Sequence, residues 1–579
     1  PSARPATPAP ANHEKARRIK RKPMDFLSGK LILQEGLTVK QSDALAAALE
    51  ASEIELCASN FLSKDTVIAA DIALVSRSLK ASLQMADSIG NTVPASVDSK
   101  QPNLQAYVEY DNRATLPTLS CAFNMEHLAA TYDTITAEVA APQGRVSMAN
   151  EAESLRATIN ANQLMASMGS MADVRSGKLA LSASARHDKG KENVLLEWRP
   201  RLRFDVQNAV AHLRGIEPEV KVPACKFEYS NREFNIDTAR VELAHSSFSL
   251  AGKVQNIGPW LEDKGLLTGN LRFISDYANI DELLALISDD SDEATAAEET
   301  TTESATPVFM VPKGVDISLY TSINLASAFS QSVRELGGMV YIRDGVMVIE
   351  EMGFICEAAK LQLTALYKTP RRNHIFCGLD YHMTNINVEE LVNMIPQVDT
   401  LLPMLRSFRG AANFHLAAET YLNDKYELKT STTRGAMSID AKDLTLLDGE
   451  VFAKIAKLLT FKKKTENKID SISAEVALYK SELDIYPFLI SCDKWMGAVG
   501  GRHHLDGTMD YHINLLSPLY LGVHVGGNLN TFEKLSDLDI KLAKCVYAKD
   551  FKPVFRGEVD TRSADIRAMI RKALESNVK

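Results

Sequence analysis

The stretch VYIRDGVMVIEEMGFICEAAKLQLTAL, residues 340–366, shows the pattern that decides the fold. Near its end polar and apolar residues alternate, in the order Lys360, Leu361, Gln362, Leu363, Thr364 and Ala365. This period of two is typical of a strand with one apolar and one polar face. The pair Asp344-Gly345 has the composition of a tight turn between antiparallel strands. The stretch therefore predicts neighbouring strands joined by short turns.

The same alternation recurs along the chain. It is found at Leu202, Phe204 and Val206, at Phe248, Leu250, Gly252 and Val254, and at Tyr511, Ile513 and Leu515. Each segment is predicted to be a strand with one apolar and one polar face. Turn-forming pairs such as Asp448-Gly449 and Asp506-Gly507 stand between strands of this kind. The fold class is therefore expected to be mainly β, with a largely antiparallel sheet.

Helices are expected to be few and short. Asn279 and Asn387 are each followed, three residues later, by a glutamate, a spacing at which the two side chains cap the first free N–H groups of a helix. Helical segments are expected at residues 280–287, 324–335, 388–395, 450–460 and 564–576. A Gly-led strand followed by a capped helix begins at Gly269, at Gly378 and at Gly557, which indicates an internal repeat.

The length of the chain predicts more than one compact region. At 579 residues it exceeds the size at which a single hydrophobic core stops growing. Residues 289–307, DDSDEATAAEETTTESATP, contain seven acidic residues and no Lys or Arg, which is typical of a disordered linker. We therefore expect a flexible basic tail at 1–23, a β-rich segment with a terminal short helix at 24–288, an acidic linker at 289–308 and a second β-rich region with short helices at 309–579.

Composition and motifs disfavour several classes of function. The formal net charge of -9 argues against nucleic acid as a partner. No window of about 18 consecutive apolar residues occurs, so no membrane-spanning helix is expected in this stretch. Motifs for nucleotide binding, serine hydrolysis and zinc proteolysis are absent, so we expect no catalytic residues, no cofactor and no enzyme. No metal site is expected either, because His503, His504, His512 and His524 lack helical ligand spacing and no C-x-x-C pair occurs.

Two stretches resemble a known family. Residues 340–366 and residues 468–513, KIDSISAEVALYKSELDIYPFLISCDKWMGAVGGRHHLDGTMDYHI, resemble the C-terminal region of AsmA-like proteins, where strands of the form G-x-apolar-x-apolar meet small or Gly-rich corners. The NIDELL and NVEELV helices that follow Gly-led strands are similar to those of the same family. The resemblance covers residues 200–579, and the earlier part is similar in texture only.

The resemblance to envelope proteins of the AsmA and TamB type implies a bacterial periplasmic protein anchored in the inner membrane. Its elongated sheet is expected to curl into an apolar groove, with lipid movement to the outer membrane as its role. The N-terminal membrane helix of that family is missing from this chain, so we expect the anchor to lie in a segment outside it. The partners implied are phospholipid acyl chains, the membrane, and an outer-membrane protein.

In a groove, the polar strand faces meet solvent and the apolar faces meet acyl chains. The alternative is a closed sandwich, in which apolar faces of two sheets pack together. The residues expected to line the groove are Leu202, Phe204, Val206, Phe248, Leu250, Leu361, Leu363, Tyr511 and Ile513. Three functions remain open: a lipid conduit, an assembly or scaffolding factor for outer-membrane proteins that uses exposed strand edges, and an adhesin-like β-protein.

Overall fold

The computed structural model describes fifteen segments of the chain. These are residues 27–34, 37–41, 47–64, 67–86, 92–111, 117–149, 154–187, 198–230, 233–283, 309–328, 331–394, 408–446, 467–492, 495–528 and 538–575. The expected basic tail at 1–23, the acidic linker at 289–308 and the expected helix at 450–460 lie outside the described residues. The expected mainly β class is confirmed.

The chain divides into two compact units. Residues 1–169 and 178–189 form the first unit, and residues 170–177 and 190–579 form the second. This division falls at a different place from the linker expected at 289–308. The strands on either side of that linker pair directly, residue against residue from Leu267 with Val315 onward, so both belong to the second unit.

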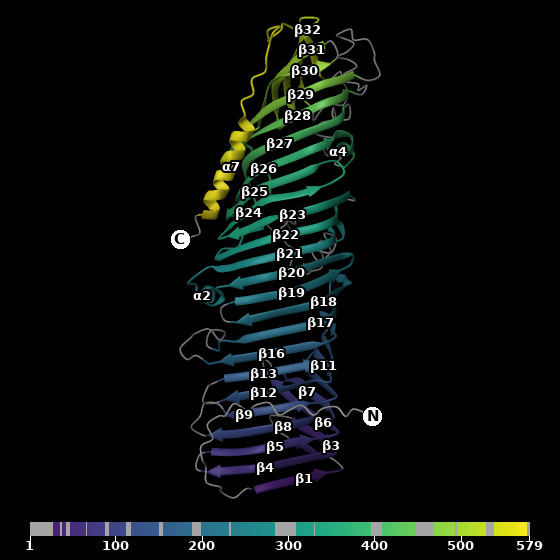
Figure 1. Ribbon diagram of the computed structural model, residues 1–579, viewed down its shortest axis with the longest axis vertical. Helices are drawn as coiled ribbons and strands as arrows, with labels where there is room; N and C mark the ends of the chain where they lie inside the picture. Colours follow the sequence, from purple (N-terminus) through teal and green to yellow (C-terminus); the bar gives the residue numbers. More distant parts are fainter. Residues whose placement is uncertain are drawn as a thin grey trace, which may run out of the picture. The chain divides into compact units, whose positions relative to one another are not determined.

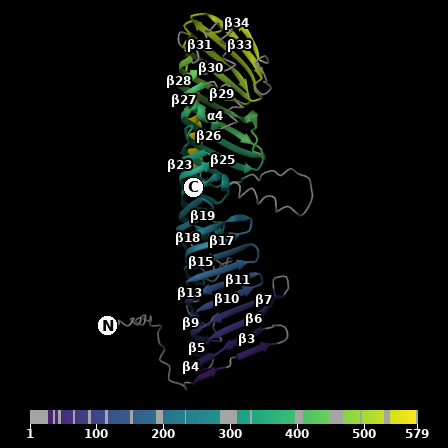
Figure 2. The ribbon, with the colours of Figure 1, turned by 90° about the vertical axis from the view of Figure 1, so that its right-hand side faces the viewer.

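The strands of the first unit form two antiparallel ladders, which Figure 2 shows on opposite sides of this unit. Ladder A runs in the order β1 (Leu27–Leu33), β4 (Ile54–Lys64), β5 (Val67–Val75), β8 (Asn103–Asp111), β9 (Thr118–Asn124), β12 (Gln143–Ala149), β13 (Ser154–Ala161) and β16 (Leu179–Arg186). Ladder B runs in the order β2 (Leu37–Gln41), β3 (Ala47–Ser52), β6 (Ser78–Ala86), β7 (Thr92–Lys100), β10 (His127–Tyr132), β11 (Ile135–Ala140) and β14 (Gln163–Met168).

The chain passes from one ladder to the other at a line of short corners, which we call the crease: residues 53, 76–77, 101–102, 125–126, 141–142 and 162. Backbone hydrogen bonds continue through it, for example from Arg77 N–H to Ser52 O (3.1 Å) and from Gln101 N–H to Arg77 O (2.9 Å). Some corners bend through the left-handed region, with φ of 50° at Gln101. The crease is thus a fold in a hydrogen-bonded surface.

The second unit is a succession of mostly longer strands, each paired with the next along the chain. They are β17 (Arg201–Leu213), β18 (Ile216–Ser230), β19 (Glu233–Leu243), β20 (Ser246–Gln255), β21 (Leu267–Asn279), β22 (Val315–Ala328), β23 (Gln331–Arg343), β24 (Val346–Ile355), β25 (Lys360–Arg371), β26 (His374–Asn387), β27 (Phe408–Leu422), β28 (Arg434–Leu446), β29 (Asn467–Tyr479), β30 (Glu482–Cys492), β31 (Trp495–His504), β32 (Thr508–Ser517), β33 (Leu521–Asn528) and β34 (Asp539–Ala543), with β15 (Ala172–Ser176) paired to β17. All these pairs are antiparallel except β21 with β22, so the expected antiparallel character is confirmed.

The described helices of the second unit are α2 (Ile257–Leu261), α4 (Val388–Met394), the 3₁₀ turn η2 (Thr430–Thr432) and α7 (Glu558–Glu575). Residues 280–283 are also helical. The two expected asparagine caps are confirmed, because Asn279 Oδ1 accepts from Glu282 N–H (3.2 Å) and Asn387 Oδ1 accepts from Glu390 N–H (3.4 Å). No described helix has the length and apolar character needed to cross a membrane.

Two helix predictions need correction. The helix expected at 324–335 is wrong: β22 and β23 form a hairpin there, with Ile323 opposite Leu336. Cross-strand packing of this apolar face outweighs the local helical pattern. The strand expected from Gly557 is also wrong, because α7 begins at Glu558 with acidic residues in its first turn, where the helix dipole favours them. The repeat therefore covers the copies at Gly269 and Gly378 and not the third.

Helix α7 lies across β25 to β29 of the second unit, as Figure 1 shows. Its buried residues follow the three-and-four spacing of one helical face: Val559, Ser563, Ile566, Ile570 and Ala573. They pack on Val348, Leu366, Ala417 and Ala436 of the sheet. Polar contacts fix its ends, since Glu475 accepts from Gly557 N–H (2.8 Å) and Arg343 donates to Leu574 O (2.5 Å).

We predict that Gly252→Ala lowers the free energy of unfolding of the second unit by about 2 kcal/mol or more. Gly252 has φ +138°, and an added Cβ would lie 2.9 Å from Leu271 Cα on the neighbouring strand. Denaturant unfolding followed by tryptophan fluorescence measures this, because Trp198, Trp260 and Trp495 all belong to the second unit. The matched control is Gly265→Ala, whose Cβ would meet only Pro259 at 3.4 Å. Equal unfolding midpoints for the two variants would contradict the prediction.

Candidate functional site

One face of ladder A is apolar from strand to strand. Directly opposite residues share a face of a sheet, so the pairing register defines rows across the ladder. One row consists of Leu31, Leu56, Leu74, Leu104, Phe123, Gly144, Ile159 and Leu181. The adjacent row on the other face consists of Lys30, Cys57, Ala73, Gln105, Ala122, Arg145, Thr158 and Ser182. Ladder A is therefore amphipathic along its whole width.

Ladder B has the same organisation. One of its rows consists of Leu49, Ala81, Val97, Ala130, Ala137 and Ala166, and the neighbouring row on that face of Ala51, Leu79, Ser99, Leu128, Val139 and Leu164. A row on the opposite face contains Glu50, Lys80, Asp98 and Glu138. Each ladder of the first unit therefore separates an apolar from a polar face.

Several side chains at the crease are buried, whereas apolar side chains at the far strand ends are exposed. Pro102 and Pro142 are fully buried at the crease, and Ile54 beside it is 6% exposed. At the strand ends far from the crease, Ile68 and Tyr110 lie opposite each other on the apolar face and are 50% and 53% exposed. Most residues of the apolar rows between are half-buried, although Leu31 and Val97 are 49% and 45% exposed. No buried hydrophobic cluster of the described residues lies in this unit.

In the second unit, one row crosses the strands from β17 to β32. It consists of Phe204, Phe227, Ile236, Gly252, Leu271, Leu319, Val340, Ile349, Ala365, Leu379, Ala418, Gly435, Leu478, Leu483, His503 and Met509. All nine residues expected to line a groove lie on the face of this row. Leu202 and Val206 flank Phe204, Phe248 and Leu250 precede Gly252 on β20, Leu361 and Leu363 precede Ala365 on β25, and Tyr511 and Ile513 follow Met509 on β32.

Parts of this face are covered. Leu361 is 7% exposed, in a cluster with Met383, Ile386 and Leu391 of α4. Leu363, the next residue on the same face, is half-buried. Aromatic rings lie across other parts of the face, with Phe204 and Phe227 centroids 5.1 Å apart and Phe248 stacked on Phe273 at 5.5 Å. Leu363 is therefore the better probe of what the uncovered part of the face contacts.

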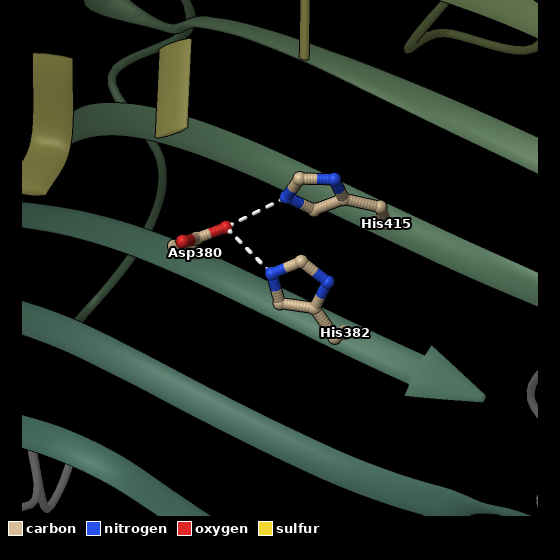
Figure 3. Close-up of side chains that lie close together, drawn as sticks. All are labelled: Asp380, His382 and His415. Carbon is tan, nitrogen blue, oxygen red and sulfur yellow. Dashed lines mark hydrogen bonds and ion pairs between the residues drawn. The ribbon is translucent and has the colours of Figure 1, made fainter. Parts of the chain in front are cut away.

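The opposite, polar face of β26 and β27 carries a cluster of ionisable groups under α7, drawn in Figure 3. Asp380 and His382 are two residues apart on β26, and His415 lies directly opposite His382 on β27. Asp380 Oδ1 lies 2.7 Å from His415 Nε2 and 3.3 Å from His382 Nε2. Asp380 Oδ2 accepts from Ser563 Oγ (2.6 Å) and Arg567 Nε (3.1 Å) of α7. One buried carboxylate thus joins two strands and a helix.

The charge of Asp380 is stabilised by its contacts. Burial by itself would raise the pKa of this carboxyl, but the hydrogen bonds from His415, Ser563 and Arg567 outweigh it and hold the pKa well below its usual range. Burial and the neighbouring His415 lower the pKa of His382. Asp380 is therefore ionised at neutral pH, beside a histidine whose neutral form is favoured.

A second cluster lies on β32 and β33. His512 pairs with His524, and Asp510 Oδ1 lies 3.3 Å from His524 Nδ1. Unlike Asp380, Asp510 is exposed. His503 and His504 lie on opposite faces of β31, as expected for neighbours on a strand, and His503 lies on the apolar face against Tyr511.

Sequence reasoning missed the Asp380 cluster. The available signal was the Asp-x-His spacing on a predicted strand, which places both side chains on one face. The contribution of His415 depends on the register of β26 with β27, and the contributions of Ser563 and Arg567 depend on where α7 docks. Neither is visible in local sequence.

We predict that Asp380→Asn lowers the free energy of unfolding of the second unit by about 2 kcal/mol at pH 7, because hydrogen bonds to a buried charge are lost or weakened. Since the folded pKa of Asp380 is depressed, its contribution is complete above the unfolded pKa of about 4 and is lost as pH falls further. Urea unfolding of wild type and variant between pH 7 and pH 2.5 measures the difference. Asp440→Asn, at an exposed strand position, is the control. A difference that stays constant down to pH 2.5 would show that the ionised carboxylate is not responsible.

The chain was compared with known proteins by two searches. None of the family models scanned matches it. The search of curated proteins also found no match.

Proposed function

We propose that this protein binds lipid acyl chains along the apolar faces of its ladders and takes part in phospholipid transport between the inner and outer membranes of a bacterial envelope. The observation that carries the proposal is the row of apolar residues that continues across consecutive strands in each unit. The resemblance to AsmA-like proteins suggests that the protein is periplasmic.

The physical need for such a face follows from the cost of exposing a lipid tail to water. At about 0.8 kcal/mol per CH₂, an acyl chain of about 16 carbons costs on the order of 10 kcal/mol to expose. The eight strands of ladder A, about 4.8 Å apart, give an apolar row about 34 Å long. Half of a bilayer's hydrocarbon core is about 15 Å thick. A single ladder is therefore long enough to accommodate an acyl chain along its apolar row.

The crease supports an open groove over a closed sandwich in the first unit. A sandwich would bury the middle of both apolar faces. Here Pro102 and Pro142 are fully buried at the crease, most residues of the middle rows are half-buried, and the far strand ends expose Ile68 and Tyr110. Two amphipathic walls that meet at a packed crease leave apolar surface for a ligand, and contiguous exposed apolar surface marks a binding site.

The protein acts by lowering the free-energy cost of moving an acyl chain through water, for which an apolar surface suffices and no catalytic step is needed. The same surface tolerates different acyl chains, because apolar contact lacks the directionality of hydrogen bonds.

We predict that Leu104→Asp abolishes lipid retention while the chain stays folded. Leu104 is half-buried in the central row of ladder A, between Leu74 and Phe123, so a carboxylate there would stand among acyl chains where an unpaired charge is very costly. The matched control is Gln105→Asp, one residue along and exposed on the polar face. Mass spectrometry of organic extracts measures bound lipid, and circular dichroism measures folding. If both variants retain wild-type lipid, ladder A does not bind acyl chains.

A second pair tests the second unit. Leu363→Asp should reduce co-purified lipid with a small change in melting temperature, whereas Lys360→Asp, exposed on the opposite face of the same strand and paired with Thr384, should change neither. If this face were packed as a closed core, Leu363→Asp would unfold the unit, because an unpaired buried charge is severely destabilising. Melting and lipid content measured on the same samples separate the two arrangements.

The scaffolding alternative has one supporting observation. Edge strand β1 pairs with β4 among the described residues, and its Leu31 and Ile32 side chains are exposed. An exposed edge can accept a strand from a partner protein. This role would be favoured over lipid binding by a partner protein that still binds the Leu104→Asp variant and no longer binds variants with a charged residue at position 32.

A further inference from the structure

The geometry of Asp380, His382 and His415 points to a metal site, which nothing in the lipid-binding proposal requires. Three atoms of the ligand types that bind divalent transition metals converge: one carboxylate oxygen and two imidazole Nε2 atoms, all within 4.8 Å of one another. Figure 3 shows both imidazole rings extending toward the same carboxylate oxygen.

The sheet itself creates this convergence. Residues two apart on a strand share a face, and the directly opposite residue of the neighbouring strand is about 5 Å away on that face. Asp380 and His382 satisfy the first relation, and His382 and His415 the second. Ligands carried by paired strands are held in place without a flexible loop, so the ion would not have to order the site.

The distances from Asp380 Oδ1 to the two histidine nitrogens are close to those between the ligands of a tetrahedral ion. Two ligand atoms about 2.0–2.1 Å from Zn²⁺ at a tetrahedral angle stand about 3.4 Å apart. Asp380 Oδ1 lies 3.3 Å from His382 Nε2 and 2.7 Å from His415 Nε2. Binding also requires the two imidazole rings, which stack with centroids 3.8 Å apart, to tilt until both Nε2 lone pairs point at one ion.

One atom in the cluster lacks a hydrogen-bond partner. His382 Nε2 is buried and makes no hydrogen bond, although it lies near Asp380 Oδ1. A buried polar atom without a partner costs roughly 1–3 kcal/mol. Hydrogen bonding within the cluster therefore accounts for His415 and leaves His382 unexplained. A cation bound by all three atoms would satisfy the lone pair of His382.

The hydrogen bonds that Asp380 accepts resemble those that hold metal-binding side chains in position in other proteins. The second oxygen of Asp380 accepts from Ser563 and Arg567, which fixes the carboxylate and leaves Oδ1 directed at the histidines. The Arg567 guanidinium is on the far side of the carboxylate and is half exposed, so solvent weakens its repulsion of a cation. The Asp510 cluster has an exposed carboxylate and no comparable support among the described contacts.

We propose that Asp380 Oδ1, His382 Nε2 and His415 Nε2 bind one divalent transition-metal ion of the zinc type, which clamps β26, β27 and α7 together. Nitrogen and carboxylate ligands in this number suit Zn²⁺, and hard oxygen-preferring ions such as Mg²⁺ and Ca²⁺ are disfavoured. The role is structural, because the site lies beneath α7 on the face opposite the apolar rows.

The test is Zn²⁺ titration of the chelator-treated full chain against a competing chromophoric chelator. His512 and His524 are replaced by alanine in every sample, so that the second cluster does not contribute. We expect one site per chain and a rise in the melting temperature of the second unit on binding. His382→Ala should weaken Zn²⁺ binding at least about 100-fold and remove the thermal shift. This variant should fold, because the His382 side chain is partly exposed and Asp380 keeps its contacts with His415, Ser563 and Arg567.

His212→Ala, which removes an exposed strand histidine paired with Glu219, is the control and should bind as the parent does. X-ray absorption of the bound zinc should show two imidazoles and oxygen ligands. Absence of a saturable site, or zinc binding unchanged by His382→Ala, would overturn the proposal. Lipid content is measured in parallel, so failure of the metal site is distinguishable from failure of the lipid-binding function.

Discussion

Strand register is the constraint on which the rest of this structure depends. Side chains alternate between the two faces of a sheet, so a slip of one residue between two strands would move every apolar side chain of one strand to the polar face. The rows through Leu104 in the first unit and Ala365 in the second exist because every pairing along them keeps the same phase. Bulges shift the register locally, as between Ile349 and Met352, and the apolar face resumes beyond them.

Register also determines which parts of the sheet are covered by other elements. On the apolar face, α4 supplies Leu391 where Leu361 would otherwise be exposed. On the polar face, α7 covers β25 to β29, and this burial has to satisfy charged groups as well as apolar ones. Asp380 and Glu475 do so with hydrogen bonds to the helix, one to side chains and one to the backbone at its start. A helix docked on a polar sheet face needs such contacts, because a buried carboxylate without partners would oppose docking.

The parts of this fold that could be predicted from the sequence are those encoded by local periodicity. Alternation at Leu202, Leu250, Leu363 and Ile513 placed all four in strands, and the asparagine caps before residues 280 and 388 were found from spacing alone. The helix expected at 324–335 failed because cross-strand partners decide that segment, and partners are not visible locally. The crease could not be predicted from local sequence either, because its corners are single residues or pairs such as Gln101 and Pro102, with no shared turn motif.

The two faces of the second unit can have different functions because the sheet is a single backbone layer and neighbouring side chains point to opposite faces. Gln362 and Leu363 are neighbours in sequence, yet one lies in the row of His382 and the other in the row of Tyr381, on opposite faces. An acyl chain bound to the apolar face, as we propose, would therefore lie only one backbone layer away from the Asp380 cluster, and the spacing between β26 and β27 is common to both faces. Hydrogen bonds between those strands resist changes of that spacing. A clamp on the polar face would consequently stiffen the curvature of the apolar face without touching anything bound to it, and this coupling requires no change in the side chains that contact lipid.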